Sequence, residues 1–453
     1  MTDQLTRRFN ELASRAEGPL RGAALDGAGH PDLADLGNLY LARPLFLPEH
    51  EIRRFEADLL AVVDLLTQLP WRVFDGDVDQ VCRMLDLDPR KAALVREFEP
   101  RPTVPFGRID AYHDGESLRI LEFNATSSIG GQQWVGPAAA AWLGAEAFRT
   151  FAAEHRLRHV DTTAVLAREL RTAARSVTGG DPVVALVEGP GGLAGYGDAW
   201  RPLQRLLRSH GLDCRLGETG DLEVRDGRVL LRGARVDIVY RLFDLDQVLD
   251  DPQALAVTEQ LRDAHRDGRV LLWSPLETDL HSNKRWMAYL SDPSLGAGLS
   301  TEEQALVDRL LPWTRALTPD TVRTAPELLD TCRERRERLI IKPDEGFANQ
   351  GIVCGWQVDD AQWASALDTA VAGGAVVQER VVPRQDWVVH PDTGVAEPWD
   401  ACYGLYWMPG GYGGGGARLV PSGQPFTLDA GSRRLSGIFH YPEDGVLHGE
   451  ESR

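Results

Sequence analysis

The 453-residue sequence contains no run of about 18 or more uncharged apolar residues, so a membrane-spanning helix is not expected. Its first residues, MTDQLTRRFNELASRAEG, are charged throughout and lack the apolar core of a secretory signal peptide. The five cysteines are widely spaced, and none forms a CxxC pair or a Cys/His metal-binding pattern. These absences argue against a disulfide scaffold and a zinc site, and they favour a cytoplasmic protein with reduced thiols.

Positive charge is also scarce, because 49 lysine and arginine residues stand against 68 aspartate and glutamate residues, for a net charge of −19. This balance argues against nonspecific binding to nucleic acid or to an anionic membrane. A local group of cations can still hold a small anion on an acidic protein. We therefore expect small-molecule partners, no nucleic acid and no membrane, and the sequence leaves a homodimer open.

The hydrophobic pattern changes along the chain. Residues 1–100 are expected to be mainly helical, including a helix over 49–69 that Pro70 ends. Residues 101–180 begin with two strands joined by a turn at 113–115 and continue with helices. Residues 181–275 alternate strands with helices, which predicts a parallel, doubly wound unit. Residues 276–453 mix helices and strands and end in a glycine-rich tract that we expect to be a flexible hairpin or loop.

A glycine-rich stretch, GPGGLAGYG, follows the first strand of the alternating unit. It does not fit the GxGxxG pattern of dinucleotide-binding loops cleanly, and no well-placed acid follows on a second strand. A loop that faces a substrate, or one that only packs a helix on a strand, is favoured over a nucleotide-binding role.

The two strands near residue 110 carry a group of polar side chains. In GRID, Arg108 and Asp110 are two residues apart, so they share one face of a strand, as do Glu122 and Asn124 in LEFN. If the strands pair across the short turn, one arginine, two carboxylates and one amide converge. Hard oxygen ligands of this kind suit Mg²⁺. The alternative interpretation is a charged, solvent-facing hairpin.

Three later segments have features of a nucleotide site. Lys342 precedes a small-residue loop, EGFANQG, whose backbone N–H groups can approach phosphate oxygens; the GK[ST] ending of a Walker A loop is absent. The extended segment VVQERVVP can offer backbone groups to an adenine edge, with Val377 and Val381 beside the ring. Lys284 lies in an amphipathic segment. Taken singly, these segments also fit a hairpin turn, a core strand and a solvated helix face.

Together the motifs resemble the circularly permuted ATP-grasp enzymes, in particular the synthetase part of glutathionylspermidine synthetase. GRID, LEFNATSSIGG and QQW stand in the order of that enzyme's pattern, and NK before an apolar helix and KP before a glycine-containing loop follow. The E-x-N motif therefore precedes the lysines, which is the reverse of most ATP-grasp enzymes. The resemblance covers about 100–140 and 275–420.

The resemblance implies an α/β (α+β) chain with a circularly permuted ATP-grasp fold. The implied parts are an N-terminal helical region (1–100), magnesium-binding strands and helices of the core (101–180), a Rossmann-like pre-ATP-grasp domain with a parallel sheet (181–275), and the lid with the nucleotide-binding core (276–453). The implied cofactors are ATP and Mg²⁺.

The resemblance also implies roles for single residues. Arg108 would stabilise charge on the phosphoryl group or acyl phosphate, Ser127 and Ser128 lie where relatives place substrate-contacting hydroxyls, and Arg418 is expected to reach phosphate or substrate. The magnesium ligands would be Asp110, Glu122 and Asn124. The nucleotide would be contacted by Lys284, Lys342, Gly346, Ala348, Asn349, Gln350, Gly351, Gln378, Glu379 and Val381.

The expected activity is ATP-dependent ligation of a small-molecule carboxylate to an amine through an acyl phosphate, on an amino acid or small peptide. Two alternatives stay open. One is a small-molecule kinase that uses the same ATP site, and the other is a non-catalytic nucleotide-binding protein. The sequence identifies neither the acid nor the amine.

Overall fold

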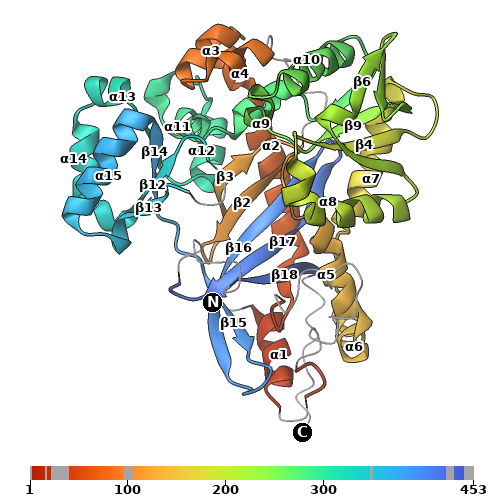
Figure 1. Cartoon of the computed structure of the whole chain (residues 1–453). Helices are drawn as coiled ribbons and strands as arrows, with labels where there is room; N and C mark the ends of the chain where they lie inside the picture. The colour runs from red at the N-terminus through yellow and green to blue at the C-terminus, as the bar shows by residue number, and fades with distance from the viewer. Residues whose placement is uncertain are drawn as a thin grey trace.

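A seven-stranded sheet runs through the centre of the molecule (Figure 1), in a computed structural model that describes residues 3–15, 18–21, 40–95, 106–346, 350–424 and 433–442. The strand order is β1-β18-β17-β16-β2-β3, and β15 also pairs with β16. All pairs are antiparallel except β1 with β18. The strands are β1 (Leu45–Pro48), β2 (Gly107–His113), β3 (Leu118–Asn124), β15 (Gln385–Val389), β16 (Ala396–Met408), β17 (Gly411–Pro421) and β18 (Arg434–Tyr441).

The N-terminal region contributes helices, as predicted, but it also contributes strand β1 to the central sheet. Its helices are α1 (Gln4–Ala13), α2 (Glu49–Phe74), α3 (Val78–Met84) and α4 (Pro89–Leu94). The expectation that Pro70 ends the second helix is wrong, because α2 continues through Pro70 and ends at Asp75, which has a φ of 52°. Leu69 and Pro70 are buried, and the burial of this apolar surface offsets the hydrogen bond that proline cannot donate.

The predicted parallel unit is confirmed. It is a four-stranded sheet in the order β10-β9-β4-β5, and every pair in it is parallel. Its strands are β4 (Val183–Glu188), β5 (Asp213–Glu218), β9 (Ile238–Arg241) and β10 (Leu271–Trp273), accompanied by α8 (Gly192–Ser209) and α10 (Pro252–Arg266). Between β5 and β9 lies a small antiparallel sheet that the pattern did not predict, formed by β6 (Leu222–Arg225), β7 (Arg228–Leu231) and β8 (Ala234–Val236).

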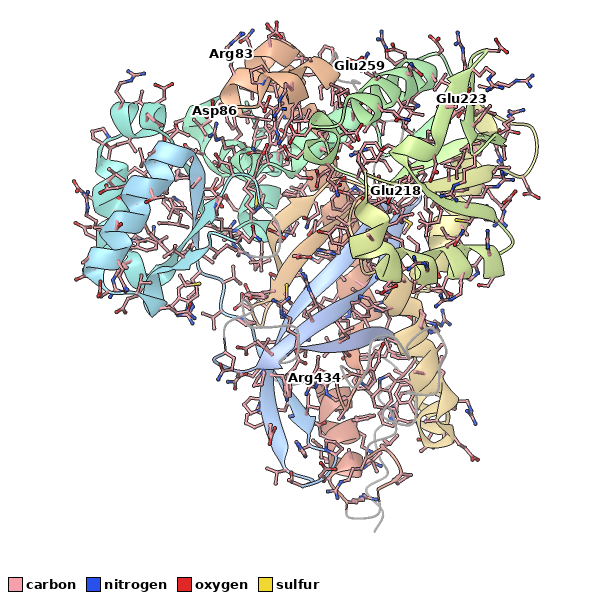
Figure 2. The ribbon with its side chains drawn as sticks, viewed as in Figure 1. Arg83, Asp86, Glu218, Glu223, Glu259 and Arg434 are labelled. Atoms are coloured by element: carbon pink, nitrogen blue, oxygen red, sulfur yellow. The ribbon has the colours of Figure 1, made fainter. Side chains whose placement is uncertain are left out.

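The glycine-rich stretch after β4 is mostly helical rather than a loop, since α8 begins at Gly192. The Glu218 carboxylate accepts hydrogen bonds from the backbone N–H groups of Gly191, at 3.1 Å, and Leu193, at 2.9 Å. Figure 2 shows Glu218 beside the start of this helix. A carboxylate thus occupies the helix N-terminus where a dinucleotide phosphate binds in other folds, which disfavours a phosphate site there.

A second α/β unit lies to the left of the central sheet in Figure 1. Its sheet is antiparallel, in the order β11-β14-β12-β13. The strands are β11 (Thr314–Leu317), β12 (Leu339–Pro343), β13 (Val353–Cys354) and β14 (Ala375–Glu379), and the helices are α13 (Pro319–Thr324), α14 (Glu327–Glu334) and α15 (Asp360–Gly373). Strands β12 and β13, which flank the EGFANQG segment, pair with each other, and Gly374, with a φ of 78°, follows α15 as its C-cap residue.

The C-terminal glycine tract forms a hairpin, which is one of the two forms expected for it, and not a loop. It comprises the end of β16 and most of β17, two long paired strands inside the central sheet, so the expected flexibility does not fit its place in the sheet. A Cβ on Gly416 would lie 2.4 Å from the ring of Trp134 on α5 (Gln132–Gly144), so glycine is required for that helix to pack on the sheet. Glycine is placed here for close approach rather than for flexibility.

Helices α5 and α7 (Thr162–Ala173) pack on strands of the central sheet, and α6 (Glu146–Glu154) packs on α5. The remaining α-helices of the described residues are α9 (Asp246–Leu249), α11 (Arg285–Ser291) and α12 (Thr301–Leu310). Within the described ranges, every helix is too short or too polar to cross a membrane.

Candidate active site

The predicted pairing of the two polar strands is confirmed. In the register of β2 and β3, Arg108 is opposite Asn124 and Asp110 is opposite Glu122. The register shifts immediately after Asp110, so the pairing is regular through the four polar residues and irregular beyond them. All four side chains line one cavity of about 390 Å³.

The C-terminal hairpin forms the adjoining wall of this cavity. In β16, Gly404 is opposite Asp110 of β2, and Cys402 is opposite Arg418 of β17. Because Gly404 has no side chain, the Arg108 side chain can lie directly beside the backbone, where a Cβ would be 3.0 Å away. The fold thereby brings residues from positions 108 and 418 into one cluster.

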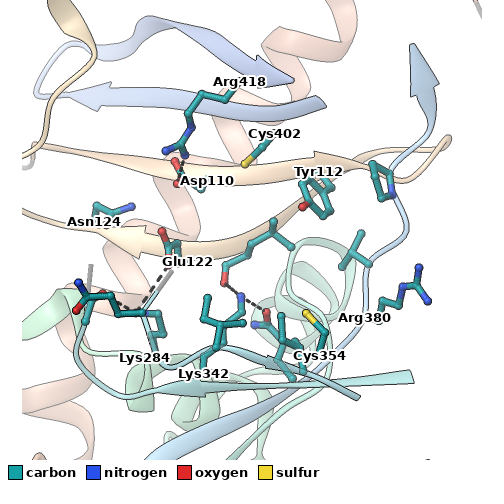
Figure 3. Close-up of a pocket in the computed structure, with 18 of the residues that line it drawn as sticks. Asp110, Tyr112, Glu122, Asn124, Lys284, Lys342, Cys354, Arg380, Cys402 and Arg418 are labelled. Carbon is teal, nitrogen blue, oxygen red and sulfur yellow. Dashed lines mark hydrogen bonds and ion pairs between the residues drawn. The ribbon is translucent and has the colours of Figure 1, made fainter. Parts of the chain in front are cut away.

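Asp110 is held between two arginines. Its carboxylate lies 2.8 Å from Nε of Arg108 and 2.5 Å from a terminal nitrogen of Arg418, which Figure 3 shows reaching toward Asp110 from β17, two strands away in the sheet. Burial by itself would raise the pKa of Asp110, but the two guanidinium groups outweigh it and hold this pKa well below its usual value. Arg108 also donates to the backbone oxygen of Gly130, at 2.9 Å, so both arginines are fixed before any ligand binds.

Two lysines form the opposite wall (Figure 3). Lys342 on β12 donates to Oε1 of Gln378, at 2.7 Å, and to the backbone oxygen of Leu121 on β3, at 3.0 Å. Lys284 lies 3.8 Å from the Glu122 carboxylate and 3.5 Å from the backbone oxygen of Gly346. Burial lowers the pKa of Lys342 to about 8, although the negative charge of Glu122 opposes this shift.

The cavity brings together most of the residues that the sequence singled out. Glu122 and Lys342, which stand far apart in the sequence, line it from opposite sides. The sequence-predicted residues in its lining are Arg108, Asp110, Glu122, Asn124, Ser128, Lys284, Lys342, Gly346, Gln350, Gln378, Glu379, Val381 and Arg418. Ala348 and Asn349 lie outside the described residues.

Two of the predicted residues lie elsewhere. Gly351 has a φ of 72° and sits against Pro343, so it serves the turn before β13 rather than the cavity lining. Ser127 is fully buried, and its hydroxyl oxygen lies 2.6 Å from the backbone oxygen of Arg241 and 2.7 Å from that of Trp273. It also accepts a hydrogen bond from the backbone N–H of Ser274, at 2.8 Å, so Ser127 joins the core to the parallel unit.

This difference between the two serines gives a stability prediction. Ser127→Ala leaves buried backbone groups without their partner and is expected to lower the free energy of unfolding by about 1–3 kcal/mol. Ser128→Ala removes only the contact of its hydroxyl with the Thr126 hydroxyl, at 3.1 Å, and keeps the backbone hydrogen bond to Thr126, so it is expected to cost less than about 1 kcal/mol. Urea unfolding of both variants checks this, and equal losses would contradict it.

The side chains of the expected adenine segment are already engaged. Gln378 accepts from Lys342 and donates to the Thr314 hydroxyl, at 3.1 Å, while the Glu379 carboxylate pairs with Arg335, at 2.8 Å. Because these polar ends have protein partners, the segment has mainly backbone groups and Val381 left to contact a base. Gln378 instead positions Lys342.

Several lining residues were missed from the sequence. They are Tyr112, Cys354, Trp356, Arg380, Asp400 and Cys402. The alternation of Asp400, Cys402 and Gly404 in β16 is a signal for two of them, but it was hidden because the tract beginning at residue 404 was expected to be a flexible hairpin or loop rather than part of the central sheet. Trp356 has no comparable signal; its ring lies under the Arg380 guanidinium, 4.2 Å from the ring centroid.

The donor set at one end of the cavity fits a magnesium ion. Glu122 and Asn124 face the cavity, and the amide nitrogen of Asn124 is buried with no hydrogen-bond partner in the described part of the chain. This side chain is thus not committed to holding the fold. The described residues contain no group of three or more His, Cys, Asp or Glu side chains placed to bind a metal by themselves. That is typical of Mg²⁺ sites, which use one or two carboxylates together with water and substrate phosphates.

Comparison with known proteins agrees with this geometry. Residues 139–374, just over half of the chain, match a family model described as a circularly permuted ATPgrasp. The chain belongs to the circularly permuted ATP-grasp family. The fold class expected from the motif order is therefore confirmed, and membership supports an ATP-dependent ligase in general. ATP-grasp ligases generally use ATP and Mg²⁺.

Individual relatives of this ATP-grasp chain add little about its reaction. Uncharacterized proteins of Mycobacterium bovis and Mycobacterium tuberculosis are 33% identical over 232 residues, which is 49% of this chain and 38% of each relative. The match thus spans well under half the length of these relatives. A glutathione synthetase-like effector from Globodera pallida has a TM-score of 0.59 at 12% identity and covers 95% of this chain and 98% of its own. At that identity the likeness concerns the fold alone.

Proposed function

We propose that the protein is an ADP-forming carboxylate–amine ligase that activates a small carboxylate as an acyl phosphate and joins it to an amine. One observation carries the proposal: a single cavity has carboxylate and amide oxygens of β2 and β3 on one wall and two lysines on the other. A nucleoside triphosphate with a bound metal ion needs both kinds of wall. Its phosphates bind lysine ammonium groups, and its metal ion binds carboxylate and amide oxygens.

Glu122, Asn124 and Asp110 would hold magnesium, which when bound neutralises charge on the phosphates of ATP. Lys342 and Lys284 would contact those phosphates, and the backbone of the 378–381 segment would contact the base. These roles follow from the positions of the side chains in the cavity lining.

Arg108 and Arg418 are suited to the transfer step. Both are held by Asp110, so their charges need little rearrangement when negative charge develops on a transferring phosphoryl group. The substrate carboxylate would attack the γ-phosphorus, releasing ADP and leaving an acyl phosphate; the amine would then attack the acyl carbon and release phosphate. We propose an amino acid or a small peptide as the carboxylate, because two fixed guanidinium groups suit a carboxylate of that size.

The direct test is a screen of amino acids in pairs, with ADP release as the first readout and mass spectrometry of the products as the second. A conjugate lighter by one water than its two components, formed with one ADP, is the expected result. A stable phosphorylated acceptor would overturn the ligase in favour of a kinase. ATP binding without ADP formation across a broad panel would favour a non-catalytic nucleotide-binding protein.

The low pKa of Lys342 predicts a pH-dependent affinity for ATP. Protonated Lys342 attracts phosphate, and the proton is lost as the pH rises through about 8. Affinity for a non-hydrolysable ATP analogue should therefore be constant below about pH 7 and fall by up to about tenfold per pH unit above pH 8. Calorimetric titration from pH 6.5 to 9.5 measures this dependence.

Lys342→Met is the matched variant for this pH series. It removes the charge and keeps a side chain of similar length, so the analogue should bind about 10- to 100-fold more weakly at pH 7, with no further loss above pH 8. Parallel pH curves for the variant and the parent protein would show that another group titrates.

A further inference from the structure

Lys91 lies on α4, in the N-terminal helical region and outside every motif discussed above. Its side chain is largely buried and reaches two carboxylates that are distant in sequence. The ammonium group is 2.9 Å from Glu345 and 2.8 Å from Asp246 on α9 (Asp246–Leu249). Figure 1 shows α4 and α9 next to each other at the top of the molecule. Lys91 therefore joins the helical region, the parallel unit and the segment that follows β12.

Glu345 begins the EGFANQG segment and lines the cavity. Its carboxylate is half exposed, and among the described residues Lys91 is the one cation within ion-pair distance of it. The preceding residue, Asp344, is bound independently by Arg285, at 2.5 Å, and its backbone oxygen accepts from the Lys284 N–H, at 3.0 Å. Asp344 is thus anchored from α11 (Arg285–Ser291), whereas the Glu345 side chain is anchored from α4.

The helical region reaches this segment at a second point. Arg285, which holds Asp344, also donates to the backbone oxygen of Met84 at the end of α3. The two short helices α3 and α4 therefore reach the start of the EGFANQG segment, called the phosphate segment below, through the Met84 backbone oxygen, which binds Arg285, and through Lys91, which binds Glu345. The N-terminal helical region thus supports this part of the cavity wall from outside the lining.

We infer that Lys91 is a positioning residue for nucleotide binding, which fixes Glu345 and thereby the start of the phosphate segment next to Lys284 and Lys342. The inference rests on the proposed use of ATP in this cavity. Lys91 itself touches no nucleotide; it acts through Glu345, and Asp246 holds its ammonium group from the other side. A lysine in this place couples the parallel unit to the phosphate segment.

The test compares three single variants by calorimetric titration with a non-hydrolysable ATP analogue and Mg²⁺, together with thermal unfolding. Lys91→Ala is expected to weaken binding about 3- to 5-fold, the upper part of the range for loss of a partly exposed ion pair. Lys91→Arg restores a charge at the same place and should recover most of the affinity. Arg90→Ala is the matched control, since Arg90 is on the same helix and pairs with exposed Asp88 and Asp250; its affinity should be unchanged.

A second measurement separates positioning from a general loss of stability. Glu345→Gln removes the group through which Lys91 is proposed to act, so adding Lys91→Ala to it should weaken binding by less than twofold further. A full, additive loss in the double variant would overturn the inference, as would unchanged affinity in Lys91→Ala. Parent protein that binds no analogue would instead overturn the proposed function, and this inference would fall with it.

Discussion

Replacing Glu122 by glutamine is expected to lower the rate of ADP formation on the order of 100- to 1000-fold. The substitution keeps the shape of the side chain and removes the negative charge that the proposed magnesium site needs. In the described part of the chain Glu122 forms a loose ion pair with Lys284, at 3.8 Å, so loss of its charge is expected to change the stability of the fold little. Steady-state ADP release at saturating ATP, Mg²⁺ and substrates measures the effect.

Glu116→Gln is the control for this variant. Glu116 lies in the exposed turn between β2 and β3, on the same hairpin but outside the cavity lining. Its ADP formation should equal that of the parent protein, and the melting temperatures of both variants should stay within about 3 °C of it. Near-normal ADP formation by Glu122→Gln would remove Glu122 from the metal site.

Arg108→Lys is expected to lower kcat about 100-fold while changing the KM for ATP much less. The Arg108 guanidinium contacts both oxygens of Asp110, at 2.8 and 3.3 Å, and also donates to the Gly130 backbone. Lysine is a point charge that cannot make these contacts together, so the charge would no longer be held in place.

The control for Arg108→Lys is Arg119→Lys on the neighbouring strand. Arg119 donates to the backbone oxygen of Leu311, at 2.8 Å, and does not line the cavity. Its kcat should remain within about twofold of the parent value. A normal kcat in Arg108→Lys would show that its positive charge alone suffices, or that the transfer step is stabilised elsewhere.

The sequence predicts the β2–β3 hairpin well because its geometry is local. Polar residues at a spacing of two on strands joined by a short turn place the four side chains near one another, although the connection spans 114–117 rather than 113–115. The exact pairing of Asp110 with Glu122 also depends on the register shift after Asp110, which the sequence does not reveal. The parallel unit is predictable for a similar reason, since strands that alternate with helices have few ways to pack.

The pairing of strands that are distant in the sequence could not be predicted. Nothing near residues 45–48 indicates that β1 pairs with β18, and the glycines of β17 have the composition of a loop. The role of Gly416 in β17 depends on Trp134, and that of Gly404 in β16 depends on Arg108; both side chains come from other elements. Local propensity is overridden here by contacts between distant segments.

The direction in which a polar side chain points is the second feature that could not be predicted from the sequence. A motif position identifies Ser127, Gln378 and Glu379, but it does not say whether their polar atoms meet a ligand or the protein. In the structure all three are engaged by protein groups. Whether such a polar atom is free to bind a ligand depends on residues that are distant in the sequence, such as Thr314 and Arg335.

The order of strands in the central sheet has a consequence for biosynthesis. Strand β2 is complete at residue 113, whereas its partner β16 does not begin until residue 396. At about 5–20 residues per second, a nascent chain waits roughly 15–60 s on the ribosome before these two strands can pair. Until then Asp110 lacks the arginine that β17 supplies, so the cavity between β2, β3 and the two lysines is among the last parts of the molecule to assemble during translation.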